Sequence, residues 1–97
     1  MMHRLKKIVE YIWEETMGAE TYAMCALSNK EEDRSLAEAY ISMATQELSH
    51  AETLISHAVR IISNAEEEHI DAIWEWEHDK VMKRMAHAKQ LIDMYRK

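Results

Sequence analysis

The chain has 97 residues, about the size of one small domain, with one Gly, one Cys and no Pro. So few turn-forming residues argue against an all-β fold, and a single Gly excludes the glycine-rich fingerprints of nucleotide-binding folds. The net charge of -6 argues against nucleic-acid binding, and one Cys excludes a disulfide framework. Six His residues in an acidic chain point to metal chemistry or to a plain helical bundle.

The first part of the chain has the pattern of an amphipathic helix. Apolar residues recur every three or four positions from Leu5 to Leu27, so we expect a helix over 4–29. The basic start does not continue into an apolar run, because acidic residues interrupt residues 8–15. We therefore expect neither a signal peptide nor a membrane segment. The protein is expected to be cytoplasmic.

Two further helices follow a polar break at residues 28–33. Ser35 followed by Glu38 has the pattern of a capping box, which predicts a helix over 35–63. A third apolar stripe predicts a helix over 65–95, although nothing before it would stop the second helix outright.

The expected fold is all-α, with residues 1–97 forming a single helical domain. The short first connection makes the first two helices an antiparallel hairpin, and the third helix follows at the C-terminal end. Because a helical hairpin encloses little core, we expect a homodimer in which two hairpins complete a four-helix bundle.

Glu47 and His50 are the central candidates for chemistry. Residues three apart lie on one face of a helix, so that both side chains can reach one ion. A carboxylate and an imidazole suit non-haem iron or a similar metal. The spacing alone is weakly specific, because it recurs in two pairs that we interpret as structural. These pairs are Glu66 with His69, and Glu75 with His78.

A third candidate ligand comes from the first helix. Glu15 and Glu47 lie at similar distances from the polar break, so an antiparallel hairpin brings them to the same height. Glu20 is the reserve ligand, since it lies closer to the centre of the apolar stripe. Tyr22 shares a side of the helix with Glu15 and is expected to donate a hydrogen bond to a ligating carboxylate.

A carboxylate-bridged di-iron site uses four Glu and two His. Two copies of Glu15, Glu47 and His50 supply that set, which predicts a site on the two-fold axis of a dimer with two iron ions per dimer. Three more residues are candidates for a secondary metal or interface role: His57, Glu77 and His78. For Glu77, pairing with a basic residue at an oligomer interface is favoured, and for His57 a solvated position.

The combined pattern resembles the first half of a rubrerythrin or ferritin-like bundle, and within that group the encapsulated ferritin family. The residues that carry the resemblance are Glu15, Gly18, Tyr22, Ala26, Glu47, His50, Ala51 and Glu52. The resemblance implies a ferroxidase that oxidises Fe(II) at a dimer interface for iron storage, in a higher homo-oligomer enclosed by an encapsulin-type shell or nanocompartment. The Trp-rich third helix and an end that does not resemble a cargo tail depart from this family.

Two alternative functions stay open. The same site would serve peroxide reduction as in rubrerythrins, although a cysteine-rich electron-transfer domain is missing from the sequence. The other alternative is a non-catalytic helical assembly or scaffold protein, in which the Glu and His side chains are merely polar.

Overall fold

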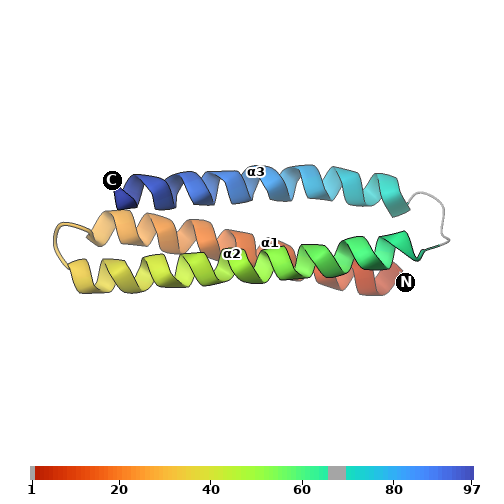
Figure 1. Cartoon of the computed structure of the whole chain (residues 1–97), viewed down its shortest axis with the longest axis horizontal. Helices are drawn as coiled ribbons and strands as arrows, with labels where there is room; N and C mark the ends of the chain where they lie inside the picture. Colours follow the sequence, from red (N-terminus) through yellow and green to blue (C-terminus); the bar gives the residue numbers. More distant parts are fainter. Residues whose placement is uncertain (1, 66–69) are drawn as a thin grey trace.

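The computed structural model describes residues 2–65 and 70–97, which form three long helices. The helices are α1 (Met2–Asn29), α2 (Arg34–Ser63) and α3 (Ile70–Arg96). Figure 1 shows them side by side in a rod that measures 53 × 17 × 14 Å. α1 and α2 form an antiparallel hairpin, and α3 runs back along α1 in the same direction as α1. The expected all-α class is therefore confirmed for the described residues.

The helix bounds differ from the expected ones mainly at the third helix. α1 begins at Met2 and α2 at Arg34, each within two residues of the expected start. The third helix is expected from about residue 65. Ala65 lies outside a helix and α3 is described from Ile70, and the residues between them lie outside the described part of the chain. Glu66 and His69 lie outside the described residues, so the structure says nothing of that pair.

The N-terminal cap of α2 is Asp33, and the expected capping role of Ser35 is wrong. The Asp33 carboxylate accepts a hydrogen bond from the backbone N–H of Leu36 at 3.1 Å. Its carbonyl accepts from the N–H of Ala37, and its own N–H donates to the carbonyl of Asn29. An N-cap must precede the first helical residue, and Ser35 already lies within the first turn. Asp33 is therefore both the last residue of the α1–α2 turn and the N-terminal cap of α2.

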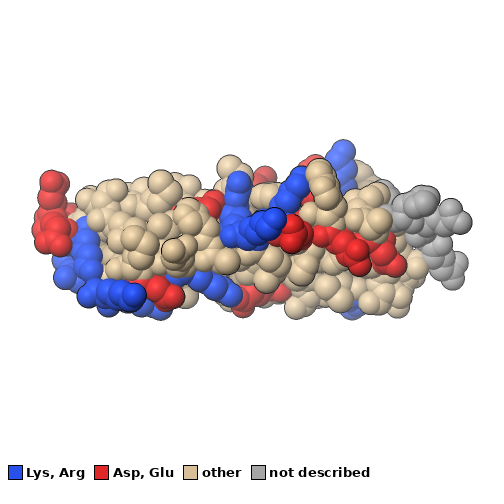
Figure 2. All heavy atoms as spheres, turned by 90° about the horizontal axis from the view of Figure 1, so that it is seen from above, with Lys and Arg blue, Asp and Glu red and all other residues tan. Residues whose placement is uncertain are grey.

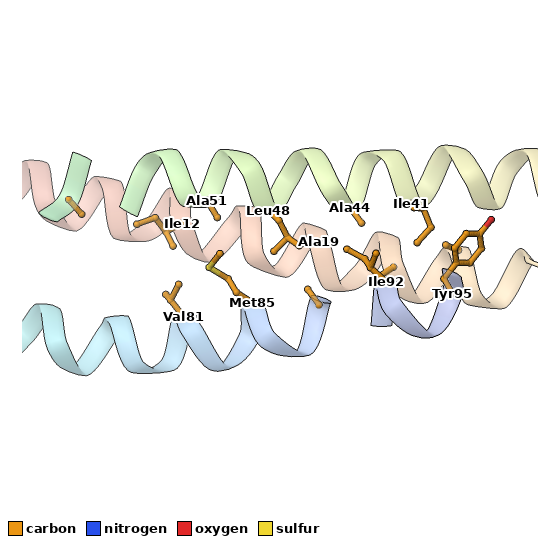
Figure 3. Packing of buried hydrophobic residues seen from close by; sticks show 14 of the residues in the cluster. Ile12, Ala19, Ile41, Ala44, Leu48, Ala51, Val81, Met85, Ile92 and Tyr95 are labelled. Carbon is orange, nitrogen blue, oxygen red and sulfur yellow. The ribbon is translucent and has the colours of Figure 1, made fainter. Parts of the chain in front are cut away.

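Alanine makes up a large part of the buried core. Figure 3 shows side chains of α2 and α3 directed toward α1, among them Leu48 and Met85. The alanines in this core are fully buried: Ala19, Ala23, Ala26, Ala37, Ala44, Ala51, Ala58 and Ala88. Small side chains allow helix axes to approach closely. α1 packs against both of the other helices.

α3 covers only one side of the hairpin. It contacts the side of α1 that carries Trp13 and Glu20, through Glu77 and Arg84. At about 100° per residue, Glu15 lies about 200° around α1 from Trp13 and is directed away from α3. The opposite side of the hairpin is therefore left uncovered by α3.

We call this uncovered side the hairpin face. Its residues follow helical spacing on both helices, and they are Tyr11, Glu15, Gly18, Tyr22, Leu36, Tyr40, Met43, Glu47, His50 and Leu54. The apolar side chains of Tyr11, Leu36 and Met43 are 50%, 40% and 38% exposed. Large exposed apolar side chains that share one face are typical of a surface that binds another molecule. None of the three helices, as described, has an apolar stretch sufficient to cross a membrane.

Candidate metal centre

Glu15, Glu47 and His50 meet midway along the hairpin face. Each residue offers one ligand atom, and these atoms lie within 4.8 Å of one another. His50 Nδ1 lies 3.3 Å from Glu15 Oε2. Within the described part of the chain, this is the group of three or more acidic, His or Cys side chains close enough to share an ion.

The helices bring these side chains together for simple geometric reasons. Glu47 and His50 are one turn apart on α2 and therefore lie on the same side of that helix. Glu15 lies opposite them, because it is separated from the turn by nearly as many residues of α1 as separate Glu47 from the turn on α2. The site thus follows from the antiparallel pairing of the two helices.

The two carboxylates are close enough to affect each other's protonation. The pKa of Glu47 is raised from 4.5 to about 7. The first cause is its hydrogen bond with Glu15, followed by burial and by the negative charge of Glu15, while His50 acts in the opposite direction. Two adjacent carboxylates need either a shared proton or a cation between them. The donor set therefore fits a metal ion that prefers oxygen and nitrogen ligands, such as iron.

The cluster is open on the side of the hairpin face. The Glu15 side chain is 25% exposed, whereas that of His50 is 59% exposed. One chain contributes three side chains, which is half of the six that a di-iron carboxylate site uses. An ion bound by one chain alone would therefore keep open coordination positions that point out of the hairpin face.

Glu20 does not join the cluster. Its two carboxylate oxygens contact α3, with Oε1 3.1 Å from Arg84 Nε and Oε2 beside His87 Nδ1. Five residues separate Glu20 from Glu15, which turns it by about 140° around α1 toward α3. Of the two candidates from the first helix, the structure brings only Glu15 to Glu47 and His50. The contact of Glu20 with His87 could not be found from the sequence, because no spacing rule links residues of α1 and α3.

The expected secondary residues lie apart from the cluster. Glu77 accepts a hydrogen bond from Trp13 Nε1 at 2.8 Å, so that among the described residues its partner is an indole and not a basic side chain. The ring of His78 lies 5.2 Å from the ring of Trp74. His57 Nδ1 lies 3.3 Å from a guanidinium nitrogen of Arg60.

Tyr22 lies on the hairpin face but does not contact the carboxylates as expected. Its ring stacks on that of Tyr40, with centroids 6.1 Å apart. Among the hydrogen bonds of the described residues, none joins the Tyr22 hydroxyl to Glu15 or Glu47. In this structure Tyr22 therefore packs beside the cluster and does not orient a carboxylate.

Comparisons of the chain with protein-family models, with curated proteins and with solved structures found no match.

Proposed function

We propose that this chain is a ferritin-like di-iron protein that oxidises Fe(II), with each metal site shared between two copies of the chain. The observation that carries the proposal is the meeting of Glu15, Glu47 and His50 at one point of the hairpin. Two carboxylates and an imidazole are a typical iron donor set. Their placement on two antiparallel helices corresponds to half of a carboxylate di-iron site.

The protein residues would bind and orient Fe(II), which is the substrate. Anionic carboxylates stabilise the more highly charged Fe(III) product more than they stabilise Fe(II). The electrons from two Fe(II) ions would pass to dioxygen or peroxide. Glu15 and Glu47 would bind the ions through their carboxylates, and His50 would supply the nitrogen ligand.

The hairpin face supports a symmetric dimer. A two-fold axis through the cluster would lay the Tyr22 end of one hairpin face on the Tyr11 end of the other, and both ends are apolar. The cluster lies near the middle of both α1 and α2, so the two faces would overlap along most of their length. The same contact would bury exposed apolar side chains and bring together four Glu and two His.

The first test is iron binding by the full chain. After anaerobic loading with Fe(II) and desalting, we expect about one iron per chain and a dimer mass by light scattering. Oxidation is then followed from the absorbance of Fe(III) after addition of dioxygen. The Glu47→Ala variant is expected to lose bound iron. The control variant Glu52→Ala, which removes an exposed carboxylate that pairs with Lys89 on α3, is expected to keep it.

The outcomes separate the proposed functions. No retained iron in the wild-type protein would overturn the di-iron proposal, and two irons per chain would contradict a shared site. Faster oxidation by peroxide than by dioxygen would favour the rubrerythrin-like alternative. Higher homo-oligomers and an encapsulin-type shell stay predictions from the resemblance, and a cytoplasmic location stays a prediction from the sequence pattern.

One observation favours the assembly or scaffold alternative. Figure 2 shows an area almost without charged side chains on the α3 side, between the charged C-terminal end and the middle of the rod. Met17, Met24 and Met94 are 53%, 54% and 52% exposed. If assembly is the whole function, Glu47→Ala should leave the oligomer mass and the unfolding temperature unchanged with or without iron.

A further inference from the structure

Gly18 is the one glycine of the chain and lies in the middle of α1. A glycine inside a helix costs roughly 1 kcal/mol of stability relative to alanine. Gly18 forms no turn and no helix end, and α1 continues on both sides of it. A local backbone requirement therefore does not explain why glycine stands here.

Close helix packing does not explain it either. Where α1 packs into the core, the chain uses alanine, and Ala19, Ala23 and Ala26 are all fully buried. Gly18 is partly exposed and lies on the hairpin face beside these positions. The feature that distinguishes Gly18 from the alanines is the side chain that lies over it.

That side chain is the carboxylate of Glu47. A Cβ atom on Gly18 would lie 2.9 Å from Glu47 Oε2, 3.3 Å from Cδ and 3.6 Å from Cγ. Real Cβ contacts are essentially never shorter than 3.0 Å. The Glu47 carboxylate thus occupies the space that any other residue at position 18 would fill. Because this carboxylate ends a flexible side chain, an added methyl group would displace it and not the backbone.

We propose that Gly18 is a positioning residue of the metal site, which holds the Glu47 carboxylate beside Glu15 and His50 by leaving out its own side chain. This inference rests on the proposed function, since it assigns Gly18 a role in binding Fe(II). It predicts that stability and metal binding respond in opposite directions to one methyl group at position 18. A residue needed only for packing would change both in the same direction.

The test uses the full chain with Gly18→Ala. The metal-free variant is expected to unfold at the same temperature as the wild type or a higher one, because alanine favours the helix. Its dissociation constant for Fe(II), measured anaerobically by calorimetry, is expected to rise about 10- to 100-fold, the range for residues that orient a ligand. Thr21→Ala is the control, since Thr21 is exposed on α1 and its replacement also favours the helix.

A second variant tests the positioning role directly. Adding Glu47→Asp to Gly18→Ala shortens the displaced side chain and moves its carboxylate back from the new methyl group. We expect Glu47→Asp to weaken Fe(II) binding in the wild-type background but to restore part of the binding in the Gly18→Ala background. A purely structural role of Gly18 would not produce this reversal.

The outcomes distinguish this inference from the proposed function. Wild-type Fe(II) binding together with unchanged binding by Gly18→Ala would overturn the role of Gly18 and leave the metal site in place. A loss of metal-free stability in Gly18→Ala would also overturn it, because packing would then account for the glycine. No Fe(II) binding by the wild type would overturn the proposed function and this inference with it.

Discussion

The two sides of α1 each hold a Glu next to a His from another helix, but with different surroundings. On the α3 side, Glu20 contacts both His87 and the permanently charged Arg84. On the hairpin face, Glu15 contacts His50 and a second carboxylate, that of Glu47. Arg84 already neutralises the carboxylate of Glu20, whereas the cluster of Glu15, Glu47 and His50 has excess negative charge. One cluster is thus a structural ion pair, and the other is suited to a cation.

The largest expected difference between the two clusters is in metal binding. Glu47→Gln should weaken Fe(II) binding by more than about 100-fold, since it removes an anionic ligand and leaves the shape of the side chain. The matched change Glu20→Gln on the α3 side should leave the dissociation constant for Fe(II) within about twofold of the wild-type value. Anaerobic calorimetry with Fe(II) measures both values. Equal losses in the two variants would show that the clusters are not distinct in function.

The second expected effect is on stability at the α1–α3 contact. Arg84→Ala removes the partner of the half-buried Glu20 and a cation that lies 4.7 Å from the Trp13 ring centre. We expect a loss of about 1–2 kcal/mol in the free energy of unfolding, measured with urea. Fe(II) binding by the folded variant should not change. A change in Fe(II) affinity would contradict the separation of the two sides.

A smaller loss of stability is expected at a second contact between α1 and α3, the hydrogen bond of Trp13 with Glu77. Trp13→Phe removes the indole N–H that donates to Glu77 Oε2 and keeps most of the apolar ring. The loss should be about 0.5–1.5 kcal/mol, as for a single hydrogen bond. Urea unfolding measures this change, with Trp76→Phe as the control because Trp76 is 62% exposed. A larger loss in the control than in Trp13→Phe would contradict the importance of this bond.

The smallest effect is the pH dependence of stability at the carboxylate pair, because solvent reaches the cluster and screens it. The pKa of Glu47 is raised to about 7 in the folded chain, so the folded state holds a proton that the unfolded state releases near pH 4.5. This group therefore favours folding at low pH, and its contribution is lost as pH rises through about 7.

Thermal unfolding of the metal-free protein between pH 5 and pH 8 tests this sign. The unfolding temperature should fall with rising pH less steeply in Glu47→Gln than in the wild type, since the amide does not titrate. Both proteins keep every other titratable group, so the difference between the two slopes reports on Glu47. Parallel slopes would show that Glu15 and Glu47 do not share a proton.

Local chemistry and counting along the chain predicted much of the candidate site. The period of the apolar residues and the lack of Pro indicate long helices. The polar break makes the first two helices antiparallel, and Glu15 then lies level with Glu47 and His50. The cap of α2 is also a local feature, since Asp33 directly precedes the helix, but the Ser35 and Glu38 pattern points two residues further along the chain.

Only the tertiary structure decided on which side of the hairpin α3 packs. Helical periodicity shows which stripe of α3 is buried but not which groove receives it, because that choice depends on side-chain fit between residues far apart in the sequence. The contact of Glu20 with Arg84 and that of Trp13 with Glu77 follow from this choice. The space above Gly18 likewise depends on where Glu47 lies across the hairpin. The sequence by itself determined the helices and their order, because the forces that form a helix act between near neighbours, whereas the partners between helices required packing in three dimensions.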